Sequence, residues 1–238
     1  MRPLLAQLRL ELTLLVRNGE SLLLTLGIPI LLLVFFANVD VLPITGEPIT
    51  FLAPGVLALA VLSTSFVNLA IATGFEREYG VLKRLGATPL GRPRLLGAKT
   101  LSILVVEAVQ IALLWVLALG LGWDPNPRAG FAVAVVLGTV AFAGLALCLA
   151  GALKALVTLA AANGLYLVLL LLSGMVIPLD ELPGPVRALA RALPSGALAE
   201  AVRGTLTIGG TVPARAWIVL AVWAVVAPVA ATRLFRWE

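Results

Sequence analysis

Residues 129–151 read AGFAVAVVLGTVAFAGLALCLAG and contain no charged side chain. A helix needs about 20 consecutive apolar residues to cross the hydrocarbon core of a bilayer. The apolar residues here follow one another without the regular polar alternation of a membrane-barrel strand. The stretch therefore predicts a transmembrane helix.

Five further stretches have the same character. They are residues 22–37, 51–75, 100–121, 155–177 and 214–232. The chain is 61% hydrophobic and 12% charged, whereas soluble domains are nearer ~45–50% apolar and ~25% charged. We therefore expect an all-α integral membrane protein with six transmembrane helices, forming a single membrane domain over residues 1–238. This composition excludes a soluble enzyme, a nucleic-acid-binding protein and a disordered chain.

The N-terminal segment, residues 1–19, mixes leucines with charged residues. Its leucines recur at helical spacing at positions 4, 8, 12 and 15, among three arginines and one glutamate. This pattern predicts an amphipathic helix that lies on the membrane surface, in contact with lipid. A cleaved signal peptide, the alternative, would have an uninterrupted apolar core.

The basic residues indicate the orientation of the chain. If the N-terminus is inside, the inner segments hold 12 of the 17 lysines and arginines, as the positive-inside rule requires. Six spans then place both termini in the cytoplasm. The net charge of +5 follows from this topology, so we expect no nucleic-acid partner. Arginine outnumbers lysine 14 to 3, which favours a GC-rich bacterial source and hence a bacterial inner membrane.

Several kinds of chemistry are excluded by residue counts. The chain has no histidine and one cysteine, Cys148, which excludes histidine-containing triads, an intrachain disulfide and a cysteine zinc site. We therefore expect no catalytic residue, metal site or cofactor on this chain. Gly144, Cys148 and Ala152 recur every fourth residue, a spacing of small side chains that favours close helix contact.

The longer inner link, residues 76–98, reads EREYGVLKRLGATPLGRPRLLGA. Alternating apolar and charged residues predict a short amphipathic helix within 76–90, which Thr88-Pro89 and Gly91 interrupt. Such a helix could dock into a groove on a soluble partner. The alternative is a solvated basic loop that only enforces topology. The candidate docking residues are Glu76, Arg77, Glu78, Tyr79, Gly80, Lys83 and Arg84.

A second long link, residues 173–213, lies on the outer side. Its prolines divide it into two short helices within 178–204. They could lie at the outer surface or be partly re-entrant. They could cap a translocation path or form a structural lid on the bundle.

Few polar groups interrupt the spans. Glu107 is the clear ionisable residue inside the membrane, with Gln110 one turn further on. Such residues usually face the bundle interior and are candidates for function. Glu107 could contact substrate or a proton, pair with Lys99 or Arg94, or form an interior hydrogen bond between helices.

These features together resemble the permease subunits of type-2 ABC exporters, including the daunorubicin-resistance and polysaccharide-export types. The match is carried by an inner set of motifs, an outer set, and the order of surface helix and six spans. The inner motifs are 76–80 (EREYG), 83–85 (KRL), 88–90 (TPL) and 97–99 (GAK). The outer motifs are 173–174 (SG), Pro178, 182–183 (LP), 193–194 (LP) and 200–203 (EAVR).

The resemblance implies the partners and the site residues. In this family the inner helix couples to the ATPase subunit, of which two copies bind ATP and Mg, and the outer helices form a lid. A second permease, identical or related, completes the complex. The second and fifth spans line the path, which makes Asn68, Asn163 and Tyr166 candidate path residues alongside Glu107. Hydrogen bonds between helices are the alternative role for these side chains.

The function expected is therefore the membrane subunit of an ATP-driven exporter. Residues 91–100 lack the spacing of a phosphate-binding loop, so any ATPase site lies on another chain. Family members move drugs and lipids among other compounds, and an apolar path favours a hydrophobic or amphipathic cargo. The alternative is a secondary transporter driven by an ion gradient, which typically carries ion ligands at the membrane midplane.

Overall fold

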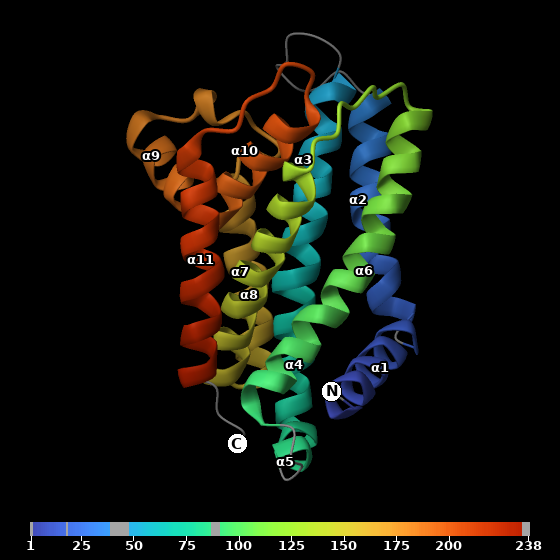
Figure 1. Ribbon diagram of the computed structural model, residues 1–238, viewed down its shortest axis with the longest axis vertical. Helices are drawn as coiled ribbons and strands as arrows, with labels where there is room; N and C mark the ends of the chain where they lie inside the picture. Colours follow the sequence, from blue (N-terminus) through green and yellow to red (C-terminus); the bar gives the residue numbers. More distant parts are fainter. Residues whose placement is uncertain (1, 18, 39–47, 87–90, 235–238) are drawn as a thin grey trace.

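The computed structural model describes residues 2–17, 19–38, 48–86 and 91–234, and all regular structure within them is helical. Most helices run along the long axis of an upright bundle (Figure 1). The all-α prediction is confirmed. The helices are α1 (Arg2–Arg17), α2 (Gly19–Asn38), α3 (Pro48–Leu62), α4 (Leu69–Glu78), α5 (Val81–Gly86), α6 (Arg92–Gly120), α7 (Gly130–Ala152), α8 (Ala155–Leu171), α9 (Gly184–Ala192), α10 (Pro194–Leu206) and α11 (Ala214–Leu234), with a π-helical segment η1 (Ser63–Asn68) and a 3-10 turn η2 (Leu179–Glu181).

Four of the described helices are long and apolar enough to cross a membrane. They are Pro48–Glu78, Arg94–Gly120, Gly130–Ala152 and Ala214–Leu234. The two other expected spans correspond to shorter apolar helices, Thr25–Asn38 and Ala155–Leu171. The structure therefore supports a multi-pass helical protein, and by length and composition it supports four of the six predicted spans.

The second predicted span is a single helix from Pro48 to Glu78 with a π-helical segment, η1, at its centre. Hydroxyl groups account for the irregularity. Ser63 Oγ donates to the carbonyl oxygen of Leu59 at 3.0 Å, and Ser65 Oγ donates to that of Val61. Such bonds compete with the backbone ladder and often bend helices. The periodicity of residues 51–75 did not predict this segment.

Helix α7 packs closely against α11 through small side chains. A Cβ added to Gly144 would lie 2.5 Å from the backbone nitrogen of Pro228. One turn further on, Cys148 Sγ lies 3.6 Å from the carbonyl oxygen of Ala227. The predicted packing role is confirmed for Gly144 and Cys148, whereas Ala152 is exposed.

The two outer helices differ in their surroundings. Helix α10 is almost wholly buried and packs against α3, α7 and α11, whereas α9 lies at the periphery (Figure 1). Arg203 on α10 donates to the carbonyl oxygen of Gly174 at 3.0 Å and lies 4.0 Å from the centre of the Phe51 ring. Burial lowers the pKa of Arg203 to about 10, against the opposing effect of Glu200. The guanidinium therefore stays charged at neutral pH and ties α10 to α3.

We expect Gly144→Ala to destabilise the bundle by about 1 to 3 kcal/mol, because the added methyl group would overlap the backbone of α11. Gly164→Ala on α8 is the matched control, since a Cβ there meets no atom within 4 Å. Thermal unfolding of the purified variants in detergent measures the difference. Equal melting temperatures for the two variants would contradict the close contact of α7 with α11.

Candidate functional site

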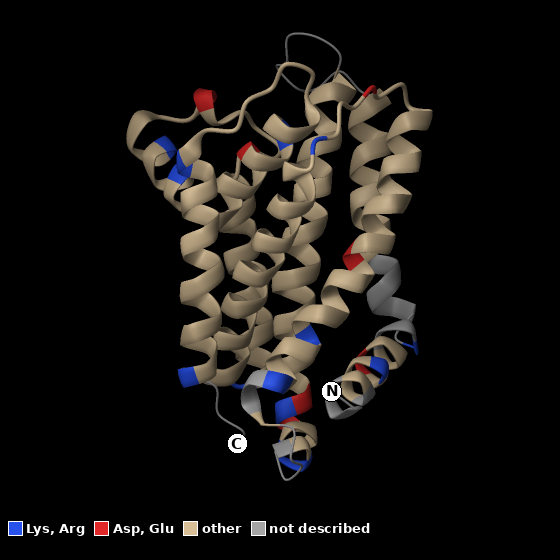
Figure 2. Ribbon diagram, viewed as in Figure 1, with Lys and Arg blue, Asp and Glu red and all other residues tan. Residues whose placement is uncertain are grey.

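Charged residues gather at the two ends of the bundle, and the middle is almost free of them (Figure 2). The lower end in this view is formed by α1, the end of α4, α5 and the start of α6 (Figure 1). It contains all seven residues predicted to dock a partner, which makes it the candidate functional site.

A buried lysine holds the lower end together. Lys99 on α6 is 1% exposed, and its Nζ lies 2.6 Å from Glu76 Oε2 on α4 and 3.0 Å from Glu11 Oε1 on α1. Gln7 Nε2 donates to Glu11 Oε1 at 2.8 Å, which fixes that carboxylate from the other side. Because each of the three charged groups comes from a different helix, the cluster joins α1, α4 and α6. We call Lys99, Glu11 and Glu76 the ion triad.

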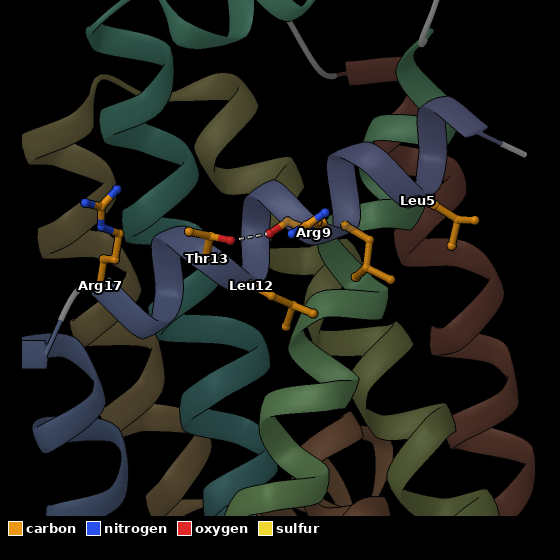
Figure 3. Close-up of a pocket in the computed structure, with 6 residues that line it drawn as sticks. Leu5, Arg9, Leu12, Thr13 and Arg17 are labelled. Carbon is orange, nitrogen blue, oxygen red and sulfur yellow. Dashed lines mark hydrogen bonds between the residues drawn. The ribbon is translucent and has the colours of Figure 1, made fainter.

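Helix α1 contacts the bundle through polar side chains. Gln7 and Glu11 are buried, whereas Leu5, Leu10 and Leu14 are 44–59% exposed. Figure 3 shows a groove along the outer side of α1, about 420 Å³ in volume, where Leu5 and Leu12 lie beside the Arg9–Thr13 hydrogen bond. An amphipathic helix was predicted here. The exposed leucines are Leu5, Leu10 and Leu14, whereas Leu8 and Leu12 of the predicted apolar face are half-buried and the side chains at positions 4 and 15 lie outside the described part of the chain.

Arg77 has a structural role at the end of α7. Its Nη1 donates to the carbonyl oxygens of Ala150, Gly151 and Leu153 at 3.0 to 3.2 Å. These carbonyls belong to the end of a helix, where backbone acceptors lack intrahelical partners and a positive charge is favourable. Arg77 therefore binds α4 to the base of α7 and does not project from the surface.

The predicted helix over residues 76–90 is corrected by the structure. Residues 76–78 complete α4, and a turn at Tyr79 and Gly80 separates them from the short helix α5. Gly80 has a φ of 71°, in the left-handed region that glycine enters at little cost. Residues 87–90 lie outside the described part of the chain.

Four of the predicted docking residues remain at the surface. Glu78, Tyr79, Lys83 and Arg84 are exposed, and Tyr79, at 70% exposure, stacks on Phe75. Leu82, between them, is fully buried and anchors α5 to the bundle. This arrangement presents charged groups and one aromatic ring from a fixed base. We call the four residues the docking surface.

A groove of about 590 Å³ adjoins the docking surface. It lies between the end of α4 and the link from α7 to α8. Its lining residues are Gly74, Arg77, Glu78, Leu153, Lys154, Ala155, Leu156 and Val157. The groove extends from the end of α4 toward α8.

The four predicted path residues fall into two groups. Asn68 and Glu107 face the bundle interior. Asn68 Nδ2 donates to Thr25 Oγ1 at 2.7 Å, and Glu107, 1% exposed, contacts Thr139. Asn163 and the half-buried Tyr166 lie on α8, where Asn163 is exposed and donates to its own helix at the Leu159 carbonyl. The structure does not bring the four together.

Glu11 and Lys99 were not predicted as partners. The pairing of Lys99 with Glu107, one of the predicted alternatives, is wrong, because the lysine forms ion pairs with Glu11 and Glu76. The sequence did contain a sign that Lys99 needs an acidic partner. Lys99 precedes an apolar stretch, and a lysine so close to a span needs a counter-ion when buried.

The structure is that of an apolar helical bundle with charged residues gathered at its two ends. The chain belongs to the ABC-2 type transporter family, whose model matches residues 4–207. The predicted resemblance is confirmed. The chain is thus the membrane-spanning permease component of an ABC transporter, and membership of this family does not favour the gradient-driven alternative. A comparison with curated proteins gives no match.

We expect Lys99→Met to destabilise the protein by about 3 to 5 kcal/mol, because it leaves two buried carboxylates without their counter-ion. Adding Glu11→Gln and Glu76→Gln to that variant removes the uncompensated charges and recovers most of the loss. Thermal unfolding of the three proteins measures both steps. A Lys99→Met protein as stable as the wild type would show that the triad contributes nothing.

Proposed function

We propose that this chain is the permease subunit of an ATP-driven exporter, with the docking surface as its contact to the ATPase. The observation that carries the proposal is the arrangement of Glu78, Tyr79, Lys83 and Arg84, exposed on a base that Leu82 and the ion triad fix to three helices. Because its base is fixed, this surface can transmit a movement of the soluble partner to the helices of the membrane domain.

The energy comes from the partner. Two ATPase subunits bind ATP and Mg, and no residue of the permease takes part in bond chemistry. Movement of the ATPases shifts α5, and the connection of Glu76 to Lys99 passes the shift to α6 and α1. A change of conformation of this kind requires that the partner binds the two states with different affinity.

A second permease subunit, identical or related, completes the path. Helix α8 supports this part of the proposal, because many of its apolar residues, Leu156 and Leu171 among them, remain exposed in the single chain. Asn163 and Tyr166 lie on the same helix and are the proposed path residues. With so few polar groups on this face, the proposed cargo is a hydrophobic or amphipathic compound, such as a drug or lipid, moved out of the cytoplasm or inner leaflet.

The proposed location is a bacterial inner membrane, with six spans and both termini in the cytoplasm. In this topology α2 and α8 cross the membrane as the first and fifth spans, despite their shorter apolar stretches. The lower end, with α1 and α5, faces the cytoplasm. The exposed leucines of α1 then meet the lipid of the inner leaflet.

We expect the double substitution Glu78→Ala with Arg84→Ala to lower transport and permease-stimulated ATP hydrolysis at least about tenfold, since it removes two exposed charges from the contact. Asp124→Ala with Arg233→Ala is the matched control, because it also removes one exposed acid and one exposed base, but from the link between α6 and α7 and from α11. Assays of the reconstituted complex give both rates. Full activity of the first double variant would refute the proposed coupling surface.

The topology makes a separate prediction. In a Cys148→Ala background, a membrane-impermeant maleimide added to intact cells labels Asp124→Cys, in the link between α6 and α7, and leaves Lys83→Cys on α5 unlabelled. Both positions are exposed in the structure. Permeabilised cells supply the control, because both cysteines should then react. Labelling of Lys83→Cys from outside would reverse the proposed orientation.

A further inference from the structure

The interior of the bundle holds a polar cluster whose hydrogen bonds are satisfied. Thr64 Oγ1 on η1 donates to Gln110 Oε1 on α6 at 2.9 Å, and Gln110 Nε2 donates to the carbonyl oxygen of Thr25 on α2 at 2.7 Å. Asn68 Nδ2 completes the set by donating to Thr25 Oγ1. Each of these donors has an acceptor on another helix. The cluster therefore has a structural role, which is to join α2, η1 and α6.

Glu107 lies one turn from Gln110 and does not fit this pattern. It is 1% exposed, its Oε2 contacts Thr139 Oγ1 on α7, and its Oε1 is buried without a hydrogen-bond partner. An ionised carboxylate in such a place needs a cation or several donors. The groups that act on this carboxyl are two hydroxyls, those of Thr139 and Ser65.

Each of these hydroxyls also lies within hydrogen-bond distance of a backbone carbonyl oxygen of its own helix. Ser65 Oγ donates to the carbonyl oxygen of Val61, and Thr139 Oγ1 lies 2.8 Å from that of Val135. A hydroxyl has one proton to donate, and a carbonyl oxygen can only accept. Thr139 Oγ1 lies within hydrogen-bond distance of both Glu107 Oε2 and the carbonyl oxygen of Val135, and its single proton can satisfy only one of them. With that proton on the Val135 bond, the contact with Glu107 is a hydrogen bond only if the carboxyl is the donor. A carboxylate has no proton to donate.

The elements whose hydroxyls lie at Glu107 supply no charge that could take the place of a proton. Neither α7 (Gly130–Ala152) nor residues 48–68 of α3 and η1 contains an acidic or basic residue, and the thiol of Cys148 lies at the α11 contact. On α6 itself, Lys99 is engaged by the ion triad. Arg94 lies thirteen residues from Glu107, about 20 Å along the helix.

We propose that Glu107 is a proton-binding site inside the membrane: its neutral carboxyl donates a hydrogen bond to Thr139 Oγ1 and so ties α6 to α7. The ligand of this site is a proton. The alternative, an ionised Glu107 that binds an alkali cation, is not part of the proposal. Glu107 then acts as a neutral contact between helices, and it contributes no negative charge to the interior.

Infrared spectroscopy of the purified permease at neutral pH tests this proposal directly, because a protonated carboxyl group has a carbonyl stretch that a carboxylate lacks. The wild type should show this band, and Glu107→Gln should lose it while retaining the fold, since its amide can donate to Thr139. Glu200→Gln is the control. Glu200 is bound by Arg215 at 2.6 Å, so its loss should leave the band unchanged.

A substitution of the acceptor provides the second test. Thr139→Val removes the oxygen that receives the proton, so the band should persist and move to higher frequency, whereas Thr139→Ser should leave it in place. A wild-type spectrum without the band, or with a band that Glu107→Gln leaves intact, overturns the proton site. A band that does not move in Thr139→Val overturns the assignment of Thr139 as acceptor. Should Glu107→Gln not fold, the threonine pair still decides.

Discussion

The lower end of this permease depends on one buried ammonium group. Lys99 lies at the start of a membrane helix and is reached by Glu11 from α1 and by Glu76 from α4. A lysine removed from water in this way is tolerated only when its charge is compensated. The same compensation brings three helices to one point, and α5 is attached to that point through Tyr79 and Gly80. The stability of the proposed docking surface therefore depends on these ion pairs.

The position of α1 follows from the same constraint. In a soluble protein an amphipathic helix buries its apolar face, but α1 turns Gln7 and Glu11 inward and leaves Leu5, Leu10 and Leu14 uncovered. The polar face is satisfied by the ion triad, whereas the exposed leucines are left for the lipid contact that the proposed topology gives them.

Periodicity and composition predicted the helical class and the four spans that the structure supports by length and composition, whereas the surface helix and the inner docking segment stay predictions. These features depend on residues near one another in the chain, which is what a hydrophobic pattern reports. The role of Arg77 could not be predicted in this way, because its acceptors Ala150, Gly151 and Leu153 are more than 70 positions away. The pairing of Lys99 with Glu11 could not be predicted for the same reason, because the two residues are 88 positions apart. The pairing of Asn163 and Tyr166 with Glu107 as one path likewise assumed a proximity that the single chain does not have.

The π-helical segment η1 has a consequence for the far end of its helix. A π turn contains one more residue than an α turn, and each residue of an α-helix rotates the chain by about 100°. Conversion of residues 63–68 to regular α-helix without loss of a residue would rotate everything beyond the segment by nearly a third of a turn. Glu76, two turns further on, would then point away from Lys99. The phase that η1 sets in the membrane interior thus decides whether an ion pair can form at the surface.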